Sequence, residues 1–306
     1  MIHDVAIVGG GICGLSIGWK LARRGLRVLI LEKGEAGHGA TWAALGILFP
    51  RVGSGDPRGP AFTELCVESH RLWPTFAEEV ESASGTEVDY GREGMLLPVF
   101  EAREEGQLRR EYALLRRLGV AVKWYRGEEL GSLEPNMSRR ANSALFNPLV
   151  HRVDNRKLAG ALKKAFLVAG GDFRENTSVA EIVIRGGRVV GVRAGGSVIR
   201  AHKVIIAAGA WSAGIPGLDE GMRPPVRPVK GQVISVIVPQ RKRFLSHMIH
   251  YADTFLVQRG NGRLLIGATV EEKGFDTRVT AGAISKLFTV ALAVIPDIGA
   301  LPLGGA

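Results

Sequence analysis

The feature that most constrains the fold is a glycine-rich turn, Gly9-Gly10-Gly11-Ile12-Cys13-Gly14, which joins an apolar run directly to a helical pattern. Residues 5–8 predict a strand that ends at the turn, and the apolar residues after it share one helix face up to Gly25. A second predicted strand, 27–31, ends at Glu32. The sequence therefore predicts a β-α-β unit in about thirty residues.

The glycines of this turn fit the demands of a bound pyrophosphate. Gly9 allows the tight turn, Gly11 lets backbone N–H groups approach the phosphates, and Gly14 lets the helix pack on the strand. Glu32 is spaced to accept hydrogen bonds from ribose hydroxyls and would repel a 2′-phosphate. The motif indicates a dinucleotide, and by itself it fits NAD, NADP or FAD.

The segment after the second strand narrows this choice. Residues 37–50, GHGATWAALGILFP, are rich in small side chains that would let backbone approach a large flat ligand. A nicotinamide dehydrogenase would normally continue with further short βαβ units. The alternative interpretation of the run is a tightly packed helix start.

With these residues in view, the sequence resembles the D-amino-acid-oxidase-like FAD-dependent oxidoreductases, and within them the glycine oxidases of the thiamine pathway. The resemblance extends over essentially the whole sequence. It rests on the opening unit and on these segments, which follow in the family's order: ATWAALGILFP, GREGMLLPVF, VKWYRGEELGSLEP, VIIAAGAWSAG, RPVKGQVISV and GRLLIGATVEEKGFDTRVTAG.

The resemblance implies FAD as the cofactor and assigns a set of positions to it. These cofactor-binding positions are Gly9, Gly11, Ile12, Cys13, Gly14, Glu32, Lys33, Ala40, Thr41, Leu45, Gly46, Ile47, Val179 and Gly209. Val179 takes the position whose backbone touches the adenine end.

The fold class we expect is α/β, with a Rossmann-like FAD-binding domain that is split in sequence. Asp154 is predicted to cap a helix over 155–169, and the runs 178–184, 189–193, 198–202 and 204–208 are predicted strands. The expected FAD-binding domain comprises 1–80 and 150–222.

The second expected domain is an α+β substrate domain built on an antiparallel or mixed sheet, from 81–149 and 223–306. Its alternating runs, QVISVIV, TFLVQR and RLLIGAT, are typical of a sheet with one buried face. A helix carries Leu108, Tyr112, Leu115 and Leu118. Such a sheet would cover the flavin and form the substrate site at the domain boundary.

Composition limits the remaining function classes. The longest apolar stretches, 204–211 and 287–295, are shorter than the ~20 residues of a membrane span, and the N-terminus shows no leader pattern, so we expect a cytoplasmic protein. Cys13 and Cys66 are too few for a disulfide framework or a metal site, and Cys13 is expected to pack on its helix. The net charge of +10 lies in scattered doublets, so nucleic acid is not an expected partner.

The resemblance implies a reaction in which a small amine, foremost glycine, loses a hydride from its α-carbon to the flavin. The imine hydrolyses to glyoxylate and ammonia or is handed to a thiazole synthase, and dioxygen reoxidises the flavin to give hydrogen peroxide. Because the cofactor carries the chemistry, no catalytic side chain is expected. His38, His247 and His250 are interpreted as exposed or packing residues.

Three residues are the candidates for substrate contact. Ile47 and Phe255 match substrate-contacting positions of the family, Phe255 where a tyrosine is usual. Tyr251 is either a substitute for that tyrosine or a core residue.

The substrate carboxylate needs a cation, ideally a bidentate arginine. In the family this arginine lies in a Trp-x-Gly-Leu-Arg-Pro segment beyond a helix over 281–295, and the sequence stops at Ala306 before it, so we expect a truncated chain. Arg259 and Arg227 remain as anion partners, with a structural ion pair the favoured interpretation of Arg259.

Three hypotheses stay open at this point. The first is a glycine or small-amine oxidase, the second a flavin oxidase or dehydrogenase of D-amino acids or sarcosine, and the third a non-catalytic fragment. GATVEEKGFDTRVTAG favours the first over the second. Homo-oligomerisation is left open by the sequence.

Overall fold

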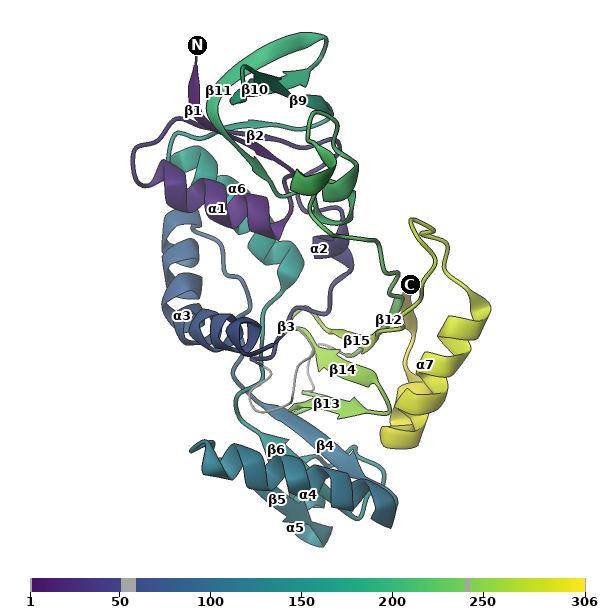
Figure 1. Cartoon of the computed structure of the whole chain (residues 1–306). Coiled ribbons are helices and arrows are strands. Elements are labelled where there is room, and N and C mark those ends of the chain that lie inside the picture. Colours follow the sequence, from purple (N-terminus) through teal and green to yellow (C-terminus); the bar gives the residue numbers. More distant parts are fainter. Residues whose placement is uncertain (1, 51–58, 240–242, 306) are drawn as a thin grey trace.

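The chain folds into two lobes, each built on its own sheet (Figure 1). The computed structural model describes residues 2–50, 59–239 and 243–305. The helices are α1 Ile12–Ala22, α2 Ala40–Ala43, α3 Pro60–Ser84, α4 Ala102–Arg117, α5 Gly127–Leu133, α6 Asn155–Val168 and α7 Ala281–Val294, with 3₁₀ turns at Gly209–Gly214, Glu220–Met222 and Pro296–Ala300. Strands β1 to β16 form the two large sheets, one in each lobe, and a short two-stranded sheet that links the lobes.

The first sheet contains the predicted βαβ unit. Its strand order is β8-β2-β1-β11-β10-β9, formed by Asp172–Arg174, Val28–Leu31, His3–Val8, Ser197–Ile206, Arg188–Ala194 and Val179–Arg185. The strands from β8 to β11 are parallel, and β11, β10 and β9 are antiparallel. This mixture confirms the expected Rossmann-like α/β class.

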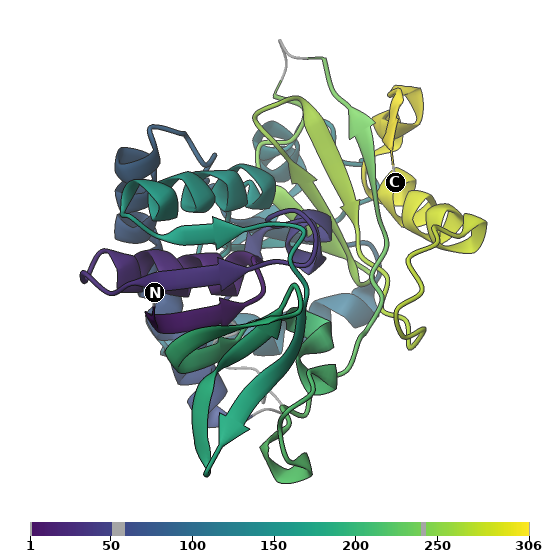
Figure 2. The same ribbon diagram turned by 90° about the horizontal axis from the view of Figure 1, so that it is seen from above.

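Helices α1 and α6 cover one face of this sheet, and α3 packs against α6 (Figures 1 and 2). Helix α6 begins where predicted, because the Asp154 carboxylate accepts hydrogen bonds from the backbone N–H groups of Arg156 and Lys157 at 3.0 and 3.1 Å. Leu158, Leu162 and Phe166 of α6 are fully buried in the core shared with α1.

Two details of the sequence analysis are wrong here. The run 198–202 and the first residues of the run 204–208 form one strand, β11, which ends at Ile206. The polar pair His202-Lys203 only marks the region where the partner of β11 changes from β10 to β1. Cys13 is exposed rather than packed, since it faces the large cavity beside the start of α1.

The second sheet has the order β16-β12-β15-β14-β13-β4-β6-β5. Its strands are Leu303–Gly305, Val233–Ile237, Arg263–Gly267, Thr254–Gln258, Met248–Tyr251, Met95–Val99, Ser143–Asn147 and Lys123–Arg126. All neighbouring pairs are antiparallel except β13 with β4, so the predicted mixed sheet is confirmed.

The two faces of this sheet have different neighbours. Leu256, Leu264 and Ile266 pack under α7, while Val257 and Leu265 point to the opposite face, in the cluster with the apolar side of α4. Leu118 does not belong to that apolar side, because α4 ends one residue earlier and leaves Leu118 52% exposed.

A two-stranded link connects the lobes, formed by β3 (Ile47–Leu48) and β7 (His151–Arg152). The domain bounds expected from the sequence stay a prediction. Within the described residues, no helix is both long and apolar enough to cross a membrane.

Candidate functional site

The glycine turn forms a tight connection between β1 and α1. Gly9 has φ +110°, and a Cβ there would lie 2.4 Å from the carbonyl oxygen of Ala207. A Cβ on Gly14 would lie 2.0 Å from the carbonyl oxygen of Gly9. A Cβ on Gly11 would meet only the Thr41 hydroxyl, at 3.4 Å, so the space beside the helix start is open. The turn therefore needs glycine at two positions for its own geometry and at one for access.

Glu32 stands at the end of β2, at the edge of the same space. Its carboxylate accepts hydrogen bonds from the backbone N–H groups of Gly10, at 2.7 Å, and Gly34, at 3.0 Å. Two carboxylate oxygens offer about four acceptor sites, so these bonds fix the group and leave capacity for ribose hydroxyls.

The small-residue segment 40–47 forms the next wall. The Thr41 hydroxyl accepts a hydrogen bond of 3.0 Å from the backbone N–H of Ile12, at the start of α1. Gly46 has φ +66°, and a Cβ there would lie 2.1 Å from the carbonyl oxygen of Val153. The segment is thus held against both α1 and the start of α6.

A single cavity of about 3010 Å³ joins these parts, which is larger than the few hundred to ~1,000 Å³ of ordinary ligand pockets. Its walls include every cofactor position expected from the resemblance except Gly14, namely Gly9, Gly11, Ile12, Cys13, Glu32, Lys33, Ala40, Thr41, Leu45, Gly46, Ile47, Val179 and Gly209. Gly14 instead packs α1 against the turn. That these residues contact a cofactor stays a prediction.

Aromatic residues of the second sheet close the other end of the cavity. Phe255 on β14 stacks on His250 of β13, with ring centroids 4.1 Å apart and planes 11° apart, and both residues line the cavity. Ile47 lines it as well. The structure therefore brings Phe255 and Ile47 to one space.

Tyr251 does not line this cavity, and its placement fits the core interpretation better than substrate contact. Its hydroxyl donates a 2.9 Å hydrogen bond to Glu104, and its ring packs against Phe100 on the face that carries the α7 core. Successive strand residues point to opposite faces, so His250 rather than Tyr251 faces the cavity.

The two arginines considered as anion partners have other partners. Arg259 is 3% exposed and donates to the backbone oxygens of Val153 and Leu45. Burial lowers the pKa of Arg259 to about 10, which still leaves it charged at neutral pH. Arg227 pairs with Glu272 at 2.6 Å on the surface. The structural interpretation of Arg259 fits, with backbone and amide oxygens as its acceptors rather than an ion pair.

Two lining residues were missed by the sequence analysis. Arg263 follows the alternation of β15 onto the cavity side, and its Nε is buried without a hydrogen-bond partner among the described residues. Glu111 lies one turn from Gln107 on the cavity side of α4, and burial raises the pKa of its carboxyl. The alternation of 263 with Leu265, and the helical spacing of 107 and 111, were the signals available.

Comparison with known proteins decides the family. The family described as "FAD dependent oxidoreductase" matches residues 4–304 of this chain. The chain belongs to this family. It is 35% identical to the glycine oxidase of Geobacillus kaustophilus over 97% of the chain and 78% of that protein. It is 30% identical, at the same coverage, to the hydrogen cyanide synthase subunit HcnC of Pseudomonas aeruginosa.

The fold agrees with this assignment. The crystal structure of the Geobacillus kaustophilus glycine oxidase superposes with a TM-score of 0.89 at 33% identity, covering 98% of this chain and 80% of that one. The chain is an FAD-dependent oxidoreductase, and FAD is its cofactor. The open cradle at Gly11, the helix start at Ile12 and the anchored Glu32 fit the pyrophosphate and ribose of FAD.

Proposed function

We propose that this protein oxidises a small amino acid, foremost glycine, with FAD as the hydride acceptor. The observation that carries the proposal is the continuity of one cavity from the glycine cradle, along segment 40–47, to Phe255 and Ile47. This puts Phe255, with the apolar residues packed around it, next to the segment expected to contact the flavin. The resemblance to glycine oxidase over 97% of the chain supports the same substrate class.

The proposed reaction removes a hydride from the α-carbon of glycine, and FAD, when bound, supplies the oxidising power. The amine loses a proton and becomes an imine, which water converts to glyoxylate and ammonia. Dioxygen takes the two electrons and two protons and leaves as hydrogen peroxide. The side chains of this protein bind and orient the substrate and exclude water from the site.

The residues near Phe255 would hold the α-carbon end of the substrate. Met95, Leu97 and Leu265 share the lining with Phe255, so water is a poor competitor there. Such an apolar wall accommodates the hydrogens of glycine or the methyl group of sarcosine. For this reason the second candidate function is oxidation of a secondary amine or of a small D-amino acid. Transfer of the imine to a thiazole synthase and a cytoplasmic location stay predictions.

The test is peroxide production by the FAD-loaded protein with glycine, sarcosine and D-alanine in parallel. We expect peroxide, glyoxylate and ammonia in equal amounts from glycine, and a lower kcat/KM for the other two. Peroxide from sarcosine or D-alanine alone would transfer the proposal to the second candidate. FAD binding without oxidation of any amine would favour the non-catalytic alternative.

A pair of variants localises the activity. Phe255→Ala removes the aromatic end of the cavity and should lower kcat/KM for glycine about tenfold or more. Leu118→Ala changes an exposed residue just beyond the end of α4 and should leave kcat/KM unchanged. Equal effects of the two variants would argue against a substrate site at Phe255.

A further inference from the structure

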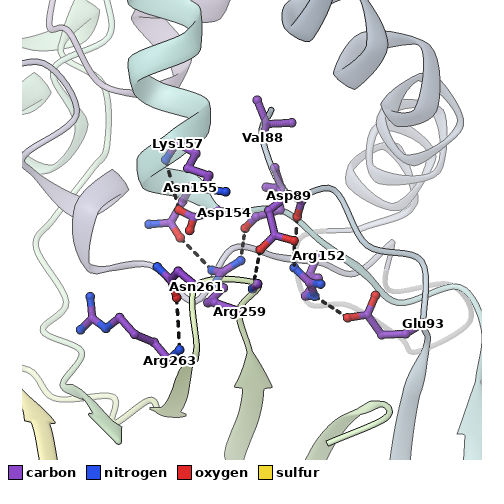
Figure 3. Close-up of polar contacts among 12 residues, drawn as sticks. Val88, Asp89, Glu93, Arg152, Asp154, Asn155, Lys157, Arg259, Asn261 and Arg263 are labelled. Carbon is purple, nitrogen blue, oxygen red and sulfur yellow. Dashed lines mark hydrogen bonds and ion pairs between the residues drawn. The ribbon is translucent and has the colours of Figure 1, made fainter. Parts of the chain in front are cut away.

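Arg259 reaches across the boundary between the two lobes. It follows strand β14 of the second sheet, and its guanidinium points toward Asn155 of the first lobe (Figure 3). Among the described residues, the acceptors of the guanidinium belong to the first lobe or its link. Nη1 donates to the Val153 carbonyl, and Nη2 donates to the Leu45 carbonyl and, at 2.9 Å, to Asn155 Oδ1. A planar fork with fixed donor directions suits three acceptors held in this way.

Asn155 continues the connection to the glycine cradle. Its Nδ2 donates to the carbonyl oxygens of Thr41 and Trp42, the latter at 3.3 Å. The hydroxyl of Thr41 in turn accepts from the N–H of Ile12 at 3.0 Å. An unbroken series of hydrogen bonds therefore links Arg259 to the first turn of α1.

Gly46 shows how closely this cluster packs against segment 40–47. A Cβ on Gly46 would lie 2.7 Å from Arg259 Nη2 and 3.1 Å from Asn155 Oδ1. The backbone N–H of Val153 also donates to the Gly46 carbonyl at 2.9 Å. Segment 40–47 therefore has no room to shift toward Arg259. The hydrogen bond from Arg259 to the Leu45 carbonyl keeps the segment from moving away.

The strand end that carries Arg259 has a second anchor. The backbone N–H of Gly260 donates to Asp89 at 2.9 Å, and the other oxygen of Asp89 pairs with Arg152 at 3.0 Å (Figure 3). Arg152 lies opposite Ile47 in the β3–β7 link. Two independent contacts thus fix the end of β14 relative to segment 40–47.

We propose that Arg259 is a positioning residue that sets the spacing between segment 40–47 and strand β14, which carries Phe255 four residues away. Segment 40–47 is the proposed flavin wall and Phe255 the proposed substrate wall, so the inference rests on the proposed function. Arg259 acts through Leu45, Asn155 and the backbone between them. Its removal leaves three buried acceptors without donors and lets the two walls move separately.

The experiment compares Arg259→Lys and Asn155→Ala with Arg109→Met, which removes an exposed guanidinium that pairs with Glu105 and lies outside the cavity. A lysine keeps the charge but cannot serve all three acceptors in the plane of the fork. FAD affinity is measured by flavin fluorescence, the environment of the bound flavin by its visible spectrum, and apoprotein stability by thermal unfolding.

We expect Arg259→Lys to weaken FAD binding about tenfold and to shift the visible flavin band. Asn155→Ala keeps the bonds of Arg259 to Val153 and Leu45, and should weaken FAD binding about threefold with a spectral shift in the same direction. Arg109→Met should change neither. A lower melting temperature with unchanged FAD affinity and spectrum in both site variants would reduce Arg259 to a structural role and overturn the proposal.

Hydrogen exchange of the apoprotein separates this inference from the proposed function. Without any FAD, amides in 40–47 should exchange at least tenfold faster in Asn155→Ala than in wild type, because the link to Thr41 is lost. Unchanged exchange refutes the link even if FAD binds and glycine is oxidised. Conversely, failure of the wild type to oxidise any amine refutes the proposed function and leaves the exchange result standing.

Discussion

Acid should destabilise this protein through a buried histidine, His151, and its half-buried neighbour His70, beside the β3–β7 link. His151 is 6% exposed, its Nδ1 lies 2.7 Å from the Tyr90 hydroxyl, and its ring centroid lies 4.3 Å from that of His70. Burial, with smaller contributions from the charges of His70 and Arg92, lowers the pKa of His151 from 6.5 to about 4. Burial lowers the pKa of His70 in the same direction.

Proton binding determines whether acid raises or lowers the free energy of unfolding. Because the pKa of His151 is lower in the folded protein, the unfolded chain binds the extra proton more readily between pH 6.5 and about 4. The stabilisation is complete above pH 6.5 and declines as the pH falls through this window. One pKa unit corresponds to ~1.4 kcal/mol, so moving from pH 7.5 to 5 costs up to ~2 kcal/mol, and about half of that once partial hydration is allowed for.

Urea unfolding at pH 7.5 and pH 5, followed by circular dichroism, measures this loss. In His151→Phe the free energy of unfolding should depend less on pH than in wild type, by ~1–2 kcal/mol between the two pH values. His202→Gln changes a histidine on the exposed side of β11 and should retain the wild-type dependence. An identical pH dependence in His151→Phe and wild type would refute the reasoning.

Three further predictions concern the site. Gly14→Ala places a Cβ 2.0 Å from the Gly9 carbonyl oxygen and should abolish FAD binding in a fluorescence titration. Glu32→Gln keeps the shape of the side chain and loses its charge, so the Kd for FAD should rise severalfold; an unchanged Kd would mean that Glu32 does not hold the ribose. Phe255→Tyr restores a phenolic hydroxyl at the cavity end, and should lower the KM for glycine in the peroxide assay.

The glycine cradle could be predicted because its determinants are local. Gly14 is required by a contact within the β1–α1 unit itself, with the Gly9 carbonyl oxygen, and Glu32 follows in the next strand. The cap of α6 by Asp154 is equally local. Such features depend on residues a few positions apart, where spacing rules hold.

The substrate end was harder to predict, because it depends on which face of a strand meets which lobe. Tyr251 and His250 are adjacent in sequence, and the turn at Ala252-Asp253, with both φ values positive, fixes their register against Phe255. A one-residue difference decides between the cavity and the α7 core. Nothing in the sequence near 251 reports the position of α7, which lies thirty residues further on.

The small residues of segment 40–47 illustrate how one sequence pattern can have two physical causes. The sequence analysis explained them by the close approach of a flat ligand. Gly39, next to this segment, is compatible with that explanation, because a Cβ there would meet nothing closer than Trp211 at 3.9 Å. Gly46 differs, since a Cβ would collide with Val153 and Arg259 of the protein itself.

Alanine substitutions at Gly39 and at Gly46 should therefore have different effects. Gly39→Ala collides with no protein atom and should act on what enters the cavity, whereas Gly46→Ala must displace Arg259 or the residues before α6. Because φ at Gly46 is +66°, an alanine there is strained as well. We therefore expect Gly46→Ala to lower the melting temperature of the apoprotein by several degrees and Gly39→Ala to leave it unchanged; equal melting temperatures would show that segment 40–47 is not held by the cluster around Arg259.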